Sequence, residues 1–399
     1  MKIITQEAPE EEQNRDLNPD SSLSSQPVSY SRGASQFLKG FFITAAAAFL
    51  IYYGAILLMM TIGAPIAAEY WVGEAIAIKK EIVKAHSGER KILLAGGSST
   101  LFGVDAQEAS KRLNLPVINF GLHAALRLDE ILWQVGTAAE PNDIVILLLE
   151  PKFFKTRSEL TFWQLRNLIG WDRDGWKEMS WVEKGELVHS IPPSLLFQML
   201  GAEYDREFSP LAVANRLETT DHAQVLTKFK NREQPKSFAY SAYNLDNFGD
   251  MLMTEGCQLE KSGTTTRPPD HVEPQTARLL QRFVSDMKSK RVEVFFANAP
   301  YIAWGASQAS LREADDRFLR EFSSIGRMID RREDLVFDAK YFFNTVLHLN
   351  SEGRSLRTDR LISAIRQNVL GGAAVSKDEI NGHPSGFEAS LSPARRGQF

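Results

Sequence analysis

The stretch Lys91-Ile92-Leu93-Leu94-Ala95-Gly96-Gly97-Ser98-Ser99-Thr100-Leu101-Phe102-Gly103 decides how this chain folds. A short apolar run ends in two glycines, and hydroxyl side chains follow at once. Apolar runs of this length are typical of a strand that is buried on both faces of a sheet. Gly96 and Gly97 let the backbone turn sharply, which leaves Ser99 in the turn to the next helix. The stretch therefore predicts one strand–turn–helix unit of a parallel α/β sheet.

The same alternation continues outward from this stretch. We expect strands at 91–95, 116–120, 143–149, 292–296 and 335–337. We expect helices at 74–90, 105–113, 126–138, 274–290, 310–324 and 351–369. Alternation of strands and helices implies a mainly parallel sheet with right-handed crossovers, so the predicted fold class is α/β.

Residues 152–270 interrupt this alternation. They are rich in tryptophan, phenylalanine and charge, and we interpret them as a mainly helical insertion. The α/β domain is therefore expected in two parts, 74–151 and 271–370. The two ends, 1–36 and 371–399, are polar and are predicted to be disordered, because such segments bury too little apolar surface to offset their ordering entropy.

A long apolar run near the N-terminus predicts a transmembrane helix over 37–68. No charged residue occurs between Lys39 and Glu69. About 20 apolar residues cross the hydrocarbon core of a bilayer, so this run is long enough to span it with some tilt. It is too long and begins too late for a cleaved signal peptide, which favours an uncleaved signal anchor. A buried helix of a soluble fold is the alternative.

The orientation of this helix follows from the charges on either side of it. Arg32 and Lys39 precede the run, while Lys79 and Lys80 follow it at a similar distance, so the count of basic residues is nearly tied. Arg32 and Lys39 have no acidic neighbour. We therefore expect a single-pass protein of the inner (plasma) membrane, with a short cytoplasmic tail and a periplasmic or extracytoplasmic main domain.

Composition narrows the range of functions. The chain has 399 residues, 43% of them hydrophobic, and a net charge of −4. It contains no lysine- or arginine-rich run, so nucleic acid is not expected as a partner. Its seven histidines are scattered and form no HExxH motif, and there is no CxxC motif, so neither a metal nor another cofactor is expected. Cys257 is the only cysteine, which excludes an intrachain disulfide.

A second stretch, Phe342-Phe343-Asn344-Thr345-Val346-Leu347-His348-Leu349-Asn350-Ser351-Glu352-Gly353, places a histidine between the last predicted strand and the last predicted helix. In open α/β sheets the ligand crevice lies at the carboxyl ends of the strands, where Ser99 and His348 would meet. A serine hydroxyl needs a base to take its proton, and histidine is the usual one. The pair would supply the nucleophile and base of a serine hydrolase or acyltransferase.

Simpler explanations exist for each residue alone. Ser98-Ser99-Thr100 would also cap a helix, and His348 would also serve as a loop residue with local hydrogen bonds. Gly96 and Gly97 would also cradle a phosphate, although their spacing matches neither GxGxxG nor the P-loop with its lysine. A nucleotide-binding domain is therefore a third hypothesis.

The two stretches resemble two blocks of the SGNH (GDSL-type) hydrolase superfamily. Gly97-Ser98-Ser99-Thr100-Leu101-Phe102-Gly103 is similar to its Gly-Asp-Ser-x-x-x-Gly block, and residues 344–353 are similar to its final block with the catalytic histidine. The His-Leu-Asn-x-x-Gly ending resembles membrane-anchored members linked to O-acetylation of cell-surface polysaccharides, including the alginate acetylation proteins. The resemblance covers 91–151 and 274–368, and it implies a three-layer, flavodoxin-like sandwich.

The resemblance also implies roles for individual residues. Ser99 would be the nucleophile, His348 would carry the proton, and Asn344 or Asp338 would orient the imidazole. The residues implied for oxyanion or substrate contacts are Gly97, Gly121, Ala124 and Lys152.

The chain departs from the family blocks at three positions. Ser98 stands where the family has aspartate beside the nucleophile, and Asn344 stands where an acid precedes the histidine. Glu150-Pro151-Lys152 replaces the Gly-x-Asn that supplies an oxyanion donor. Loss of one such donor typically lowers the rate roughly 10²–10³-fold. Lys152 would replace that donor as a cation, and Glu150 is a further source of local charge.

Two functions follow as hypotheses. The first is a membrane-anchored serine esterase or O-acyltransferase that acts on acyl groups of an exported polysaccharide or another acylated envelope glycan, working beside a membrane-bound acyltransferase. The alternative is a catalytically degenerate domain that binds polysaccharide or assembles a modification or export complex. Tryptophans of the insertion would stack on sugar rings or pack within the fold; these are Trp163, Trp171 and Trp176.

Overall fold

The computed structural model describes residues 30–62, 66–155, 160–208, 221–259, 269, 271–302 and 308–371. The chain divides into two compact units, Met1–Ala55 and Ile56–Phe399. The predicted tails over 1–29 and 372–399 lie outside the described residues.

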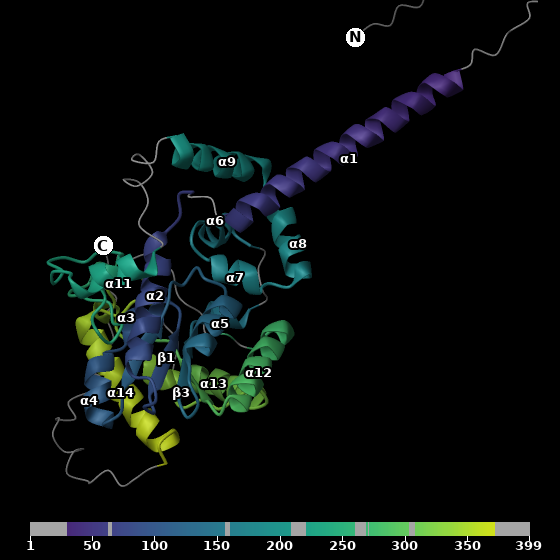
Figure 1. Ribbon diagram of the computed structural model, residues 1–399. Helices are drawn as coiled ribbons and strands as arrows, with labels where there is room; N and C mark the ends of the chain where they lie inside the picture. The colour runs from purple at the N-terminus through teal and green to yellow at the C-terminus, as the bar shows by residue number, and fades with distance from the viewer. Residues whose placement is uncertain are drawn as a thin grey trace, which may run out of the picture. The chain divides into compact units, whose positions relative to one another are not determined.

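The described part of the first unit belongs to one apolar helix, α1 (Tyr30–Ile62), which continues into the second unit (Figure 1). Its segment Gly33–Ile62 is long and apolar enough to span a membrane. More than half of the surface of each large apolar side chain is exposed at Phe37, Phe41, Phe42, Ile43, Phe49, Leu50 and Ile51. The predicted boundaries need correction at both ends. Residues 30–36 are helical rather than part of a tail, and the helix ends at Ile62 rather than at residue 68.

The second unit is built on a parallel sheet of four strands: β1 (Ile92–Gly96), β2 (Val117–Gly121), β3 (Ile144–Leu149) and β4 (Glu293–Asn298). Their order is β2-β1-β3-β4 (Figure 1). In the register, Gly96 pairs with Gly121 on one side and with Leu148 on the other. β1 and β2 therefore end at the same level, and β3 ends one residue beyond it. The prediction of a mainly parallel α/β sheet is confirmed.

The predicted strand at 335–337 is wrong. Val336 forms only an isolated parallel bridge with Tyr301, and a short 3-10 helix, η3 (Arg332–Leu335), comes directly before it. An apolar run of three residues is too short to specify a strand against such local turns.

Helices connect the strands. Around the sheet these are α2 (Tyr70–Ala85), α3 (Ser98–Gly103), α4 (Ala106–Leu113), α5 (Leu128–Ala138), α12 (Pro274–Ser289), α13 (Gln308–Phe322) and α14 (Ser351–Asn368). Between β3 and α12 lie η1 (Pro151–Phe154), α6 (Phe162–Gly170), α7 (Arg173–Glu178), α8 (Trp181–Ser190), α9 (Pro193–Phe208), α11 (His222–Lys230) and η2 (Ala242–Asn244). The described residues between β3 and α12 thus contain helices and no strand of the sheet.

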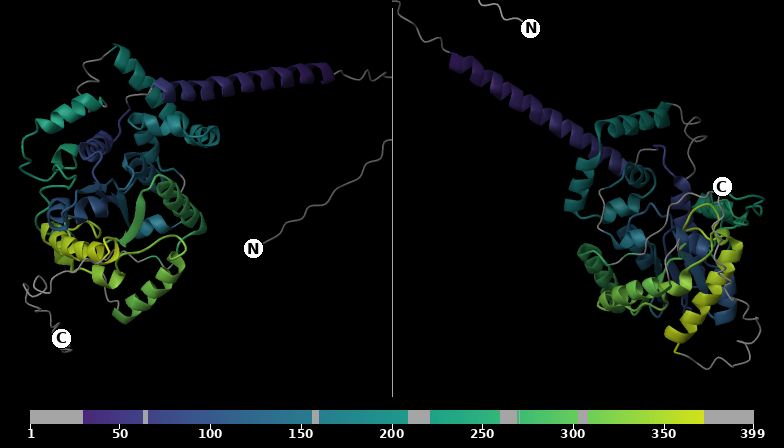
Figure 2. Two further views of the ribbon diagram at one scale, coloured as in Figure 1. Left: turned by 60° about the horizontal axis from the view of Figure 1, so that its bottom comes forward. Right: turned by 180° about the vertical axis from the view of Figure 1, so that it is seen from behind.

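Both faces of the sheet are covered, because successive side chains of a strand point to opposite sides. Leu93 and Ala95 of β1 join one apolar cluster with residues of α2, α5 and α12. Ile92 and Leu94 join a second cluster with residues of α4 and α14, which lie side by side (Figure 2). Burial on both faces explains why β1 and β3 are continuous apolar runs.

A buried polar cluster attaches the end of the insertion to the outer edge of the sheet. The N–H of Asn119 in β2 donates to Phe248 O at 2.9 Å. Lys79 Nζ donates to Asn119 O at 2.6 Å and to Gly249 O at 2.5 Å. Asp250 accepts from the Asn119 amide at 2.7 Å. Burial lowers the pKa of Lys79 to about 7 and raises the pKa of Asp250 to about 7.

We expect Lys79→Met to lower the free energy of unfolding of the second unit by about 3 kcal/mol. The change leaves two buried carbonyls without a donor and takes a cation away from Asp250. Urea unfolding of the full chain in detergent, followed by tryptophan fluorescence, measures this loss. Lys84→Met, on an exposed position of the same helix, is the control and should cost less than about 0.5 kcal/mol. Equal losses for the two variants would contradict the assignment.

Candidate active site

The imidazole of His348 lies against Ser98, not Ser99. The distance between His348 Nε2 and Ser98 Oγ is 2.8 Å. Ser99 Oγ is buried and has no hydrogen-bond partner among the described residues. Gly97 is the N-cap of α3, so Ser98 is its first helical residue and Ser99 its second. Successive helical residues point about 100° apart. The prediction that Ser99 pairs with the histidine is therefore corrected by one position.

Asn344 is the group behind the imidazole ring. Its Oδ1 lies 2.8 Å from His348 Nδ1, and its Nδ2 donates to Tyr240 Oη at 2.9 Å. With the amide held this way, Oδ1 accepts from Nδ1–H, so Nε2 presents its lone pair to the Ser98 hydroxyl. This is the tautomer that a general base requires. Asp338 instead precedes η4 (Ala339–Tyr341), and no described hydrogen bond joins it to the ring.

The loop that carries His348 is held at both ends. Phe342 and Leu349 form an antiparallel bridge, and Phe343 N–H donates to His348 O at 2.7 Å. Asn350 then caps α14, its Oδ1 accepting from Gly353 N–H at 3.0 Å. A Cβ at Gly353 would lie 2.4 Å from a backbone oxygen, so only glycine fits at that position. The histidine therefore reaches the serine from a fixed backbone.

Aromatic side chains enclose the ring. Phe102 stacks on His348 with a centroid distance of 4.1 Å and an interplanar angle of 2°. Phe238, Tyr240 and Phe343 pack around Phe102. His348 is only 6% exposed and Ser98 only 5%. Burial, together with the proximity of His123, lowers the pKa of His348 to about 3. The ring is therefore neutral at physiological pH, with an unprotonated nitrogen 2.8 Å from the Ser98 hydroxyl.

Glu150 belongs to the site, although the sequence analysis predicted only that it would contribute local charge. It follows β3 directly and is fully buried. Its Oε1 accepts from Ser99 N–H at 2.9 Å and lies 3.4 Å from Ser98 Oγ. Gly97 makes room for it, since a Cβ there would lie 2.5 Å from Oε1. The signal in the sequence was an acidic residue at the carboxyl end of a buried strand.

Gly121 and Lys152, two of the residues implied for oxyanion contacts, already have hydrogen-bond partners. Gly121 N–H donates to the side-chain oxygen of Asn119 at 2.8 Å. Lys152 Nζ donates to Ala124 O and lies 3.6 Å from Glu150 Oε2. In this arrangement the ammonium group of Lys152 interacts with the Glu150 carboxylate and with the backbone carbonyl of Ala124.

The tryptophans of the insertion have partners within the fold. Trp163 stacks on His123 at a centroid distance of 4.8 Å and donates to Glu69 at 2.9 Å. Trp171 donates to Asn167 at 2.8 Å. Trp176 is buried. These contacts favour packing as the role of the three tryptophans.

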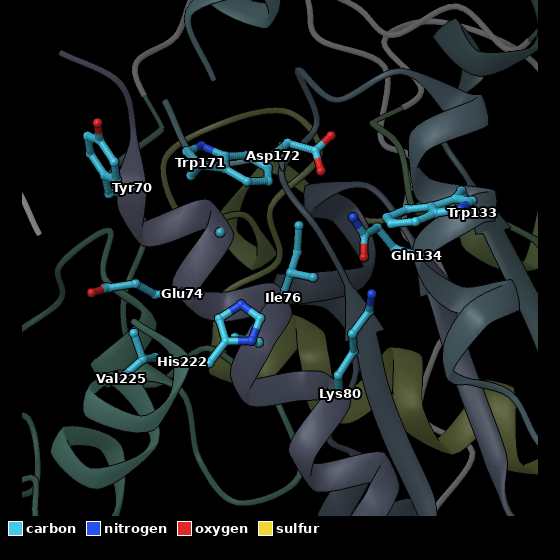
Figure 3. Close-up of a pocket in the computed structure, with 12 residues that line it drawn as sticks. Tyr70, Glu74, Ile76, Lys80, Trp133, Gln134, Trp171, Asp172, His222 and Val225 are labelled. Carbon is cyan, nitrogen blue, oxygen red and sulfur yellow. The ribbon is translucent and has the colours of Figure 1, made fainter. Parts of the chain in front are cut away.

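A small pocket of about 70 Å³ lies apart from the serine. Figure 3 shows Lys80 of α2 facing Trp133 and Gln134 of α5 in this pocket. Lys80 Nζ lies 4.9 Å from the centroid of the Trp133 ring. Neither Ser98 nor His348 lines the pocket. Within the described ranges, no group of three or more His, Cys, Asp or Glu side chains is placed to hold a metal ion.

Acid should destabilise the wild-type protein more than a His348→Gln variant. The folded state keeps His348 neutral down to a pKa of about 3, whereas the unfolded chain binds a proton near the ordinary value of 6.5. Between these values the unfolded state takes up more protons, so stability falls as the pH falls. Between pH 7 and 4.5 the wild type should lose about 2–3 kcal/mol more than the variant in urea unfolding. Parallel losses would contradict the burial of a neutral ring.

The function of this site is inferred from its geometry, because comparisons with known proteins give no match. No protein-family model, no curated protein and no solved structure matches the chain. The site is therefore characterised by what its atoms do: a buried serine hydroxyl, an imidazole 2.8 Å from it, and an amide oxygen 2.8 Å behind the imidazole.

Proposed function

We propose that the second unit is a serine esterase or O-acyltransferase with Ser98 as its nucleophile. One observation carries this proposal: Ser98, His348 and Asn344 form a continuous hydrogen-bonded relay with two links of 2.8 Å. A serine becomes a nucleophile when a base is positioned to take its proton and a third group orients that base. Three residues from two distant parts of the chain meet these conditions in the order that the chemistry requires.

In the first half of the reaction, Ser98 Oγ bonds to the carbonyl carbon of an acyl ester while its proton moves to His348 Nε2. The carbonyl electron pair shifts to oxygen and gives a tetrahedral oxyanion. When that pair returns, the bond to the alcohol oxygen breaks and His348 gives its proton to the leaving alcohol. The acyl group stays on Ser98.

In the second half, an acceptor hydroxyl attacks the acyl-enzyme. Its proton moves to His348 Nε2, its oxygen bonds to the acyl carbon, and Ser98 Oγ leaves and takes the proton back. Water as acceptor gives hydrolysis, and a sugar hydroxyl gives transfer. The burial of Ser98 among Phe102, Glu150 and His348 favours a small acyl group such as acetyl.

The proposed setting is the cell envelope. An apolar helix of spanning length precedes the α/β unit, which supports a membrane anchor. We propose that the main domain lies outside the cytoplasm. The strand order and the covering of both sheet faces are consistent with an SGNH-like sandwich. We propose an exported polysaccharide or another acylated envelope glycan as substrate, with a membrane-bound acyltransferase as partner.

A degenerate binding domain is the second candidate, and two observations favour it. The orienting group is the neutral Asn344, which stabilises an imidazolium less well than a carboxylate does. The carboxylate of Glu150 lies on the Ser99 N–H, close to where an oxyanion would form. Such a domain would bind glycan or assemble a modification complex without turnover.

Fluorophosphonate labelling distinguishes the two serines and the two functions. We expect the wild-type chain in detergent to be labelled, Ser98→Ala to lose labelling entirely, and His348→Ala to react at least about 10³-fold more slowly. Ser99→Ala is the matched control and should retain labelling, because its hydroxyl contacts no described base. Labelling that depends on Ser99 would overturn the assignment. No labelling of folded protein would favour the binding domain.

Asn344→Asp should raise the rate of acylation at pH 7 by about tenfold or more. A carboxylate behind the ring stabilises the imidazolium and raises the pKa of His348 from its depressed value. The acid limb of the kcat/KM profile for p-nitrophenyl acetate should therefore move to higher pH than in the wild type. Asn114→Asp, on an exposed helix end, is the control and should leave the profile unchanged. An unshifted acid limb in Asn344→Asp would contradict the relay.

A further inference from the structure

The side chain of Glu150 competes with the reaction proposed for Ser98. Its Oε1 accepts from the Ser99 N–H at 2.9 Å and lies 3.4 Å from Ser98 Oγ, and the side chain is fully buried. The Ser99 N–H follows Ser98 directly in the chain, and a backbone N–H next to a nucleophile can donate to a developing oxyanion. This donor already holds the Glu150 carboxylate.

The conflict is one of charge. Attack by Ser98 creates a second negative oxygen within a few ångströms of the Glu150 carboxylate. Like charges in a site closed to water repel strongly, and the Ser99 N–H cannot serve both anions fully. The arrangement therefore stabilises the resting site and disfavours the tetrahedral intermediate.

The structure also provides a second partner for the carboxylate. Glu150 Oε2 is buried without a hydrogen-bond partner, and Lys152 Nζ lies 3.6 Å from it. The Lys152 side chain is 44% exposed, so it has room to follow the carboxylate. A shift of Glu150 toward Lys152 would free the Ser99 N–H.

We propose that Glu150 is a positioning residue that restrains Ser98 by occupying the Ser99 N–H, and that Lys152 holds its carboxylate when the site becomes active. This inference rests on the proposed acyl transfer at Ser98. It implies that the resting enzyme reacts slowly with small esters.

The first test compares wild type with Glu150→Gln in the full chain. Glutamine keeps the shape and removes the charge, and its amide can donate to an oxyanion. We expect kcat for p-nitrophenyl acetate to rise roughly 10²–10³-fold, the scale of one oxyanion donor, while KM changes less than about twofold. Glu293→Gln, an exposed carboxylate at the opposite end of the sheet, is the matched control and should change neither constant.

The second measurement tests how the charge of Glu150 affects the binding of an anionic adduct at Ser98. Phenylboronic acid bonds to Ser98 Oγ as its proton moves to His348, giving a tetrahedral anion that resembles the intermediate. Glu150→Gln should bind it about tenfold or more tightly than the wild type does. A merely structural role of Glu150 would weaken binding or leave it unchanged, and either result overturns the proposal.

Lys152→Met provides an independent variant. Without the cation the carboxylate should remain on the Ser99 N–H, so kcat should fall several-fold. The same substitution in a Glu150→Gln background should have little effect, because no carboxylate needs a partner. Equal effects of Lys152→Met in the two backgrounds would contradict the role given to Lys152.

The outcomes also separate this inference from the proposed function. If Ser98-dependent labelling is present and Glu150→Gln does not accelerate acylation, the restraint by Glu150 is wrong and the acyl transfer stands. If neither wild type nor Glu150→Gln reacts with the ester, the fluorophosphonate or the boronic acid, the acyl transfer is wrong, and the inference falls with it.

Discussion

The burial of β1 between two parallel neighbours is the constraint on which the site depends. Its residues are fully enclosed, and its last residue, Gly96, pairs with both Gly121 and Leu148. The chain leaves this strand and begins a helix almost at once. Ser98 therefore lies at the carboxyl end of the central strands. The backbone leaving β3 two residues beyond Leu148 brings Glu150 to the same place. Nucleophile and carboxylate are neighbours because their strands are.

The chemistry of the site is a balance between burial and charge. Burial keeps His348 neutral, so its Nε2 lone pair is available to the Ser98 hydroxyl. The same burial penalises the imidazolium that results, and Asn344 offers it an amide dipole instead of a charge. Glu150 adds a negative charge beside the serine. An enzyme built this way would be slow at rest, and its rate would depend on small movements of one carboxylate.

The sequence predicted the four strands of the sheet to within two residues, because an apolar run buried on both faces leaves a clear pattern. It also predicted that the loop with His348 would lie at the serine end of the sheet. It was wrong about residues 335–337, where the apolar run is too short to outweigh local turns. It was wrong by one position about the serine. A sequence motif gives the spacing of residues, but the direction of each side chain depends on where the helix begins.

The sequence by itself determined the α/β class, the apolar helix before it and the pairing of a glycine turn with a distant histidine. The first two are properties of local composition and periodicity, and the third followed from the expected place of both segments at the carboxyl ends of the strands and from the family resemblance. Only the tertiary structure decided that Ser98 faces the ring, that Asn344 rather than Asp338 stands behind it, and that Glu150 occupies the Ser99 N–H. The reason is physical: each of these contacts joins residues from different elements, and side-chain direction at an element's end is set by how the elements pack.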